Sequence, residues 1–163
     1  MKSEHLAAFE NVRGQIGCCG IWCGSCPVGN GSLRKLTAKY EEVLHSHGLE
    51  HWAPEDLDYG EFVRALGVVK RVASCAGCRK GGGRDNCELR SCCESKAVRD
   101  CLECAERSRC EHGQVLEHMR SGARAAGLLV KDVSGSSNEQ LTREWEAAVR
   151  SSWPSSVLFM EEA

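Results

Sequence analysis

The sequence lacks any run of about 18 apolar residues, the length that a membrane-spanning helix requires. Residues 1–5 also lack the basic start and apolar centre of a signal peptide. We therefore expect a protein that does not associate with membranes and that stays in the cytoplasm. A net charge of −2 lacks the strong positive excess that is typical of proteins binding nucleic acid. Nucleic acid is for this reason not an expected partner.

The sequence also lacks an internal repeat and any convincing run of alternating apolar and polar residues. The predicted fold class is therefore mainly α, a small helical domain with a cysteine-rich, metal-knotted loop region. Apolar residues at helical spacing, with caps and glycine stops, predict helices over residues 4–13, 32–47, 58–73, 94–107, 112–126 and 138–150. Caps are expected at Ser32, Asp58 and Ser136, and Gly14 and Gly127 are expected to end helices.

We expect one domain over residues 1–163, with a cysteine-rich metal-binding part at 15–112 and a C-terminal helical part at 113–163. Eight of the twelve cysteines lie between Cys75 and Cys110, in a segment poor in large apolar residues. In the reducing cytoplasm such cysteines more often hold metal than form disulfides. Two Cys-x-x-Cys pairs, Cys75/Cys78 and Cys101/Cys104, have the spacing of tetrahedral zinc sites.

A second constellation is Cys19-x3-Cys23-x2-Cys26 followed by Pro27, in a glycine-punctuated loop that cannot be regular helix. Three thiolates in eight residues can bind three corners of a 4Fe-4S cluster, or form a zinc site with a fourth ligand from elsewhere. The chain is too short for the barrel of a radical S-adenosylmethionine enzyme, which has similar spacing.

The region 64–99 carries nine cationic residues against three acidic ones, whereas 41–61 has no Lys or Arg. Zinc bound by four thiolates carries net negative charge, and nearby cations stabilise both that charge and the thiolate form of cysteine. A role in stabilising zinc-bound thiolates therefore explains the basic stretch, and nucleic acid binding is not needed to explain it.

In order along the chain come Cys19-Gly20-x-x-Cys23-Gly24-x-Cys26-Pro27, Cys75-x-Gly77-Cys78, Cys87-x4-Cys92, Cys101-x-x-Cys104 and a final Cys110. This pattern, over about residues 15–130, resembles the cysteine-rich family called domain of unknown function 3795. The resemblance implies a zinc-binding protein of bacteria or archaea without an established activity. Arg84 stands where the family often has a further cysteine, and Cys110 follows Cys104 at a longer spacing than usual.

The cysteines that match this pattern are the candidate metal ligands: Cys19, Cys23, Cys26, Cys75, Cys78, Cys87, Cys92, Cys101, Cys104 and Cys110. We favour one zinc held by the two Cys-x-x-Cys pairs. A second centre would use Cys19, Cys23 and Cys26, with a fourth ligand from Cys87, Cys92 or Cys110. Cys18 and Cys93 each adjoin a candidate ligand and are expected to be buried or spare. His112 is the histidine with the best claim to be an additional ligand.

Three functions remain open at this stage. The chain is a binding module with structural zinc and an unknown protein partner, or an iron–sulfur protein or metalloenzyme using the Cys19/Cys23/Cys26 centre, or a protein that handles metal or thiol-reactive ions. The sequence has no Ser-His-Asp or paired-carboxylate signature, so whether it is an enzyme stays undecided.

Overall fold

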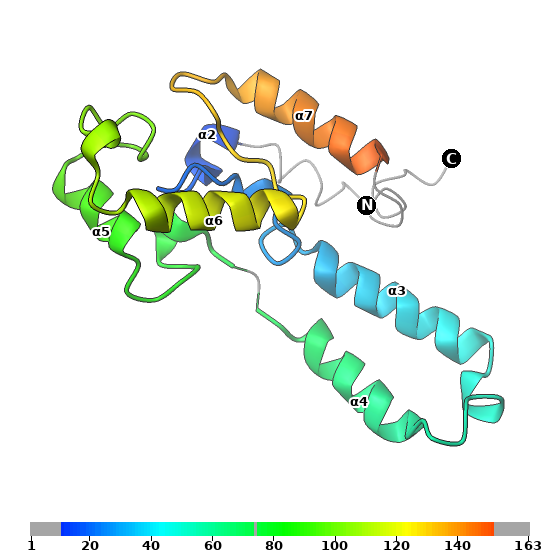
Figure 1. The fold of residues 1–163 in the computed structure, drawn as a ribbon. Helices are drawn as coiled ribbons and strands as arrows, with labels where there is room; N and C mark the ends of the chain where they lie inside the picture. The colour runs from blue at the N-terminus through cyan, green and yellow to red at the C-terminus, as the bar shows by residue number, and fades with distance from the viewer. Residues whose placement is uncertain (1–10, 74, 152–163) are drawn as a thin grey trace.

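The computed structural model describes residues 11–73 and 75–151, apart from the side chains of residues 149 and 150, and is mainly helical (Figure 1). Its helices are α2 (Val12–Gln15), α3 (Ser32–Ser46), α4 (Tyr59–Lys70), α5 (Glu88–Ser95), α6 (Gly113–Ala125) and α7 (Asn138–Ser151). In this part of the chain extended backbone is limited to isolated bridges, between Ile16 and Trp22 and between Ile21 and Val130. The predicted mainly α class is confirmed. None of the described helices is both long and apolar enough to cross a membrane.

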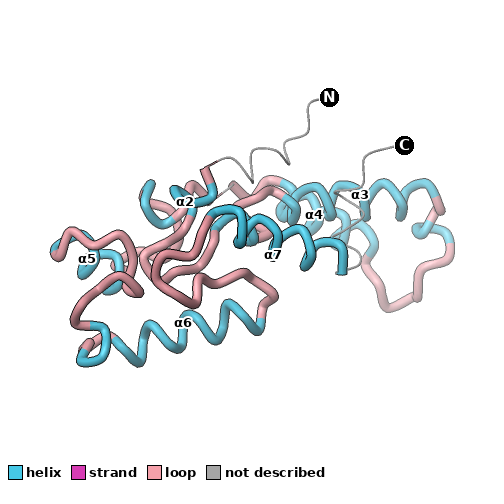
Figure 2. Tube along the Cα trace, turned by 90° about the horizontal axis from the view of Figure 1, so that it is seen from above, coloured by secondary structure: helices cyan, strands magenta, loops and turns pink. Residues whose placement is uncertain are grey.

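Helices α3 and α4 pack on each other as a hairpin that extends away from the other helices (Figure 1, Figure 2). The rings of Tyr40 and Phe62 meet edge to face, with centroids 6.4 Å apart. The Asp58 side chain accepts a hydrogen bond from the Glu61 N–H at 2.8 Å, which confirms the predicted cap. The predicted cap at Ser32 is wrong, because Ser32 is already helical and Gly31 takes the N-cap position with φ +79°.

A tryptophan pair anchors the core between α2 and α7. Trp22 is fully buried, and its ring meets that of Trp145 edge to face with centroids 5.5 Å apart. The buried cluster around this pair consists of Val12, Ile16, Trp22, Leu141 and Trp145. Trp22 therefore belongs to the hydrophobic core, even though it lies within the first cysteine loop.

The helix predicted over residues 94–107 is wrong. The observed helix, α5, ends at Ser95, and Ala97 has left-handed backbone with φ 52°. The carboxylate of Asp100 then accepts the Leu102 N–H at 2.9 Å, which competes with helix formation. Cys101 and Cys104 consequently lie on turns rather than on one helix face.

The remaining helix predictions are confirmed in type and corrected at their ends. The loop around Cys19–Cys26 is not regular helix, as expected; it contains a 3-10 turn, Cys23–Ser25, and the isolated bridges of Ile21 and Trp22. Most of the helix predicted over 4–13 lies outside the described residues, and α2 continues past Gly14, which was expected to end it. The cap of α7 is Ser137, whose hydroxyl accepts from the Gln140 N–H at 3.1 Å, rather than Ser136. Gly127, with φ +75°, follows α6 as predicted.

Candidate functional site

All twelve cysteines lie in the described part of the chain, and none of them forms a disulfide. Nine of them line cavities in two separate sets, and the buried Cys93 is one of the nine. We call Cys23, Cys26, Cys75 and Cys78 the first cysteine group. We call Cys92, Cys101, Cys104 and Cys110 the second cysteine group.

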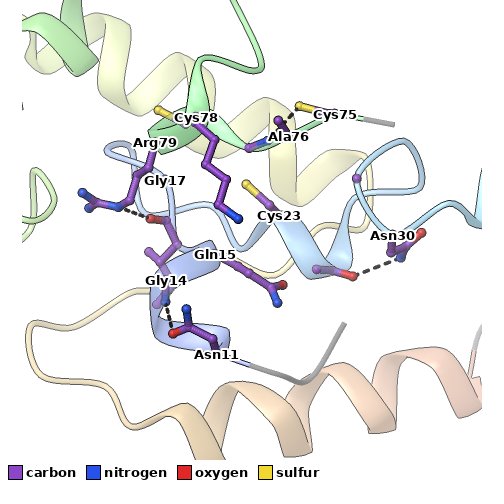
Figure 3. A pocket seen from close by; sticks show the side chains of 15 residues that line it. Asn11, Gly14, Gln15, Gly17, Cys23, Asn30, Cys75, Ala76, Cys78 and Arg79 are labelled. Carbon is purple, nitrogen blue, oxygen red and sulfur yellow. Dashed lines mark hydrogen bonds between the residues drawn. The ribbon is translucent and has the colours of Figure 1, made fainter. Parts of the chain in front are cut away.

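The first cysteine group brings together two segments that lie about fifty positions apart in the sequence. Cys23, Cys75 and Cys78 line a cavity of about 400 Å³ (Figure 3). Cys26 and Cys75 line a second, adjoining cavity. The backbone of the first loop is held by a turn in which the Cys26 N–H donates to the Cys23 carbonyl at 3.0 Å.

Two arginines fasten the Cys75–Cys78 loop to its surroundings. Arg79 donates from Nε to the Ile16 carbonyl at 2.9 Å (Figure 3), which joins this loop to the segment after α2. Arg90 on α5 donates from Nη1 to the carbonyls of Cys78 at 3.3 Å and Gly82 at 3.1 Å. The loop is therefore positioned by guanidinium groups rather than by apolar burial, and it keeps two positive charges near its sulfurs.

The glycines of this loop allow the backbone to approach the sulfur of Cys75 closely. The Gly77 N–H donates to Cys75 Sγ at 3.4 Å. A Cβ at Gly82 would lie 2.9 Å from the same sulfur and 2.8 Å from the Gly77 nitrogen. The glycine run that follows Cys78 is thus needed for close packing around Cys75, and Gly82 is the member that makes the contact.

The second cysteine group lines a much smaller cavity of about 20 Å³, together with Cys93. Its members come from α5, from the turns after it and from the segment before α6. A cavity of this size is close to the roughly 10–15 Å³ that one water molecule needs. The ammonium of Lys96 forms an ion pair with Glu106 and interacts electrostatically with Cys92 and Cys104. A cation therefore also lies beside this group.

Buried thiols connect the two groups. The Sγ atoms of Cys18 and Cys78 lie 3.7 Å apart, and those of Cys93 and Cys101 lie 3.6 Å apart. Cys18, Cys93 and Cys101 are buried in one apolar cluster with Leu89 and Leu116. The expectation that Cys18 and Cys93 are buried is confirmed.

The pKa values of these thiols separate Cys78 from the rest. Burial raises the pKa of Cys19, Cys23, Cys93 and Cys101 above the usual thiol value. The pKa of Cys78 is lowered to about 6 by a hydrogen bond with the Cys18 thiol, aided by the charges of Arg90 and Arg79. The pKa of Cys18 is raised by the same hydrogen bond and by burial. Of the thiols with a shifted pKa, Cys78 is thus the one whose surroundings favour the thiolate.

The structure brings the candidate ligands together in an unexpected combination. The two Cys-x-x-Cys pairs, which we expected to share one zinc, line different cavities. Of the other candidates, Cys19 and Cys87 border the apolar cluster that contains Cys18. The ring of His112 lies near the carboxylates of Glu88 and Glu111, at 3.4 and 3.5 Å.

No three or more His, Cys, Asp or Glu side chains are arranged to hold a metal ion within residues 11–73 and 75–151. The donor set nevertheless suits zinc, because each group supplies four cysteine sulfurs and nearby cations. Placing a zinc ion in either group requires the sulfurs to draw together.

Sequence reasoning missed Arg120, which positions the first cysteine loop. This guanidinium is buried and donates to the carbonyls of Cys19 at 3.1 Å and Lys131 at 2.9 Å. The Lys131 N–H in turn donates to the Gly20 carbonyl at 2.8 Å. An arginine on the apolar face of a predicted helix, one position after Met119, was the only signal in the sequence.

Comparison with known proteins gives a family but no described relative. No curated protein and no solved structure matches the chain. The family described as "Protein of unknown function (DUF3795)" matches over residues 15–115, a range that contains every cysteine of both groups. Because this match covers more than half of the chain, the chain belongs to the DUF3795 family of proteins of unknown function.

Proposed function

We propose that this protein binds zinc through cysteine thiolates at two centres, one in each cysteine group. The first centre would use Cys23, Cys26, Cys75 and Cys78, and the second would use Cys92, Cys101, Cys104 and Cys110. The observation that carries the proposal is that cysteines from distant segments line shared cavities in two sets, four in the first and, with the buried Cys93, five in the second. Four sulfurs per ion is the number that a closed structural zinc site requires.

The charges around the sulfurs support this assignment. Thiolates, not thiols, are zinc ligands, so each group must lose protons on binding. Arg79 and Arg90 lower the pKa of Cys78, and Lys96 lies beside Cys92 and Cys104. These cations offset the net negative charge of a zinc ion bound by four thiolates.

Zinc in this proposal is structural, and the protein acts as a binding module. Besides Trp22, the cysteine segments have few large buried side chains, and Leu89, Leu102 and Leu116 are the leucines buried near them. Zinc would cross-link these segments and supply folding free energy that apolar burial does not. Cys18, Cys19, Cys87 and Cys93 would stay outside both centres.

Elemental analysis of anaerobically purified protein tests the proposal. We expect colourless protein with two zinc ions per chain. Chelation should reduce the far-ultraviolet circular dichroism signal, because the cysteine-rich part should then unfold. Serine variants of Cys75 and Cys104 should each lose one zinc ion. Protein with neither zinc nor iron, and with a fold insensitive to chelators, would contradict the proposal.

The size of the first cavity favours a second candidate at that centre. At about 400 Å³ it is far larger than the cavity of the second cysteine group, which is large enough for an ion only. Cysteine sulfurs around such a space also suit a 4Fe-4S cluster. Brown protein with iron and acid-labile sulfide, and with zinc at one centre only, would favour this candidate over a second zinc.

A further inference from the structure

A polar cavity of about 280 Å³ lies where the start of α7 meets the turn after α5. Its lining comes from four separate segments, namely the end of α2, residues 99–103, Lys131 and residues 135–139. None of its described lining residues is a cysteine or a histidine, and Ile16 is the residue that it shares with the cavity of the first cysteine group. A site that four distant segments build is a feature of the folded chain rather than of one loop.

Two arginines in this cavity have no partner among the described residues. The Nε of Arg99 is buried and makes no hydrogen bond with any residue that the structure describes. Neither Arg99 nor Arg13 forms an ion pair within the part of the chain that the structure describes. A buried guanidinium N–H without an acceptor is costly, since its hydration is lost and nothing replaces it. The arrangement therefore calls for an acceptor that residues 11–73 and 75–151 do not supply.

The other charges that line the cavity are largely accounted for. Lys131 donates from Nζ to Asp100 Oδ2 and to Glu103 Oε1, both at 2.9 Å. Asp100 is almost fully buried, and its second oxygen accepts the Leu102 N–H. Glu139, the remaining carboxylate, is exposed to solvent. The three cations and three carboxylates of the lining balance in number, and the two arginines are the cations among them that form no ion pair with the described residues.

The beginning of α7 adds further donors on the same side. Ser137 caps this helix by accepting from the Gln140 N–H, and the helix continues for 14 residues. The first turn of a helix has N–H groups without intrahelical partners and a partial positive charge. This turn begins with Asn138 and Glu139, and both residues line the cavity together with Ser136.

We propose that this cavity binds the phosphoryl group of a small anionic ligand, with Arg99 and Arg13 as its charged donors. Guanidinium groups pair with phosphate oxygens through two parallel hydrogen bonds, and helix starts bind the same group. The volume lies just below the range of about 300–1,000 Å³ for pockets that enclose drug-sized ligands, so the ligand is small. A carboxylate shares part of this chemistry but presents fewer acceptor oxygens.

Titration of the full-length protein with inorganic phosphate, followed by amide NMR, tests the proposal. We expect saturable shifts centred on residues 99–103 and 135–139. Sodium chloride at the same ionic strength should leave these residues unchanged, and acetate should bind more weakly than phosphate. Absence of localised shifts with phosphate, or equal shifts with chloride, would overturn the proposal. Tighter binding of acetate than of phosphate would overturn the choice of a phosphoryl group.

Variants that replace an arginine by uncharged glutamine then test which arginines bind phosphate. Arg99→Gln should weaken phosphate binding by about tenfold or more, as expected when a charge-assisted hydrogen bond is lost. Arg13→Gln, at an exposed side chain, should weaken binding without affecting the fold, and it keeps the proposal testable if Arg99→Gln fails to fold. Arg143→Gln, at an exposed position on α7 itself, is the matched control and should bind as the wild type does. Wild-type affinity in both Arg99→Gln and Arg13→Gln would overturn the proposal.

Discussion

The sulfur of Cys78 lies 3.7 Å from that of Cys18, sixty positions earlier in the chain. The hydrogen bond between them, aided by Arg90 and Arg79, lowers the pKa of Cys78 to about 6, whereas the pKa of Cys18 is raised. The two cysteines are near neighbours in space but differ in chemistry. The surroundings of Cys78 favour the thiolate that binds metal, whereas Cys18 is buried and favours the thiol.

This difference predicts opposite results for two serine substitutions. Cys78→Ser should lose the metal ion of the first cysteine group, because it removes a ligand and leaves the group with three sulfurs. Cys18→Ser should keep that ion, since a hydroxyl can still donate a hydrogen bond to the Cys78 sulfur. The measurement is the zinc content per chain after anaerobic purification at neutral pH. Retention of both ions in Cys78→Ser would remove Cys78 from the ligand set.

The helices could be predicted from the sequence because their signals are local. Apolar residues at helical spacing gave α3, α4, α6 and α7, and the Asp58 cap was predicted from a four-residue pattern. The end of α5 could not be predicted in the same way. It depends on left-handed backbone at Ala97 and on the Asp100 side chain, which is held by Lys131 from a distant segment.

The combination of cysteines also depends on tertiary contacts. A Cys-x-x-Cys pair specifies only that its two sulfurs are close together, and it contains no information about a partner pair. The pair at Cys75 lies near Cys23 because Arg79 bonds to the Ile16 carbonyl and Arg90 bonds to the Cys78 carbonyl. These bonds join residues that are distant in the sequence, so spacing alone favoured a different pairing.

The buried ion pair between Lys131 and Asp100 should be important for stability. Both side chains are at most 5% exposed, and Lys131→Met would leave the Asp100 carboxylate buried without its partner. Breaking a buried pair in this way typically costs about 3–5 kcal/mol. We expect a loss of this size in the free energy of unfolding, measured with urea. Lys39→Met, which breaks an exposed pair with Glu42, is the control and should cost no more than about 1 kcal/mol.

The double variant Lys131→Met/Asp100→Asn separates the ion pair from the packing around it. Asparagine keeps the side-chain oxygen that accepts the Leu102 N–H and removes the buried charge. We therefore expect the double variant to recover most of the stability that Lys131→Met loses. A double variant as unstable as Lys131→Met would show that packing of the lysine stem, and not the unpaired charge, determines the loss.

The same pair predicts how stability changes at alkaline pH. Burial alone would lower the pKa of Lys131, but hydrogen bonds to Asp100 and Glu103 outweigh it and raise the pKa above the usual 10.5. A group whose pKa is raised on folding stabilises the protein below its unfolded pKa, and this contribution is lost as the pH rises through the folded value. The stability of the wild type relative to the Lys131→Met/Asp100→Asn variant should be constant from neutral pH up to 10.5 and fall above it. Urea unfolding of both proteins across this range makes the measurement, and titration of the cysteines largely cancels in the difference. A relative stability that rises above pH 10.5 would contradict the assignment.

Gly82 should be needed for metal binding although it has no side chain. A Cβ at this position would lie 2.8 Å from the Gly77 nitrogen and 2.9 Å from Cys75 Sγ, closer than such atoms approach in proteins. The loop cannot yield easily, since the Gly82 N–H donates to the Gly77 carbonyl at 2.9 Å and the Gly82 carbonyl accepts from Arg90. Gly82→Ala should therefore displace Cys75 and weaken zinc binding at the first cysteine group, by about tenfold for each 1.4 kcal/mol of strain that binding must overcome.

Gly122→Ala is the matched control, because nothing lies within 4 Å of its Cβ position and alanine favours a helix interior. Competition with a chromophoric chelator measures both affinities. Equal zinc affinity in Gly82→Ala and in the wild type would contradict the prediction. It would show that Cys75 does not bind the metal from its place beside Gly82.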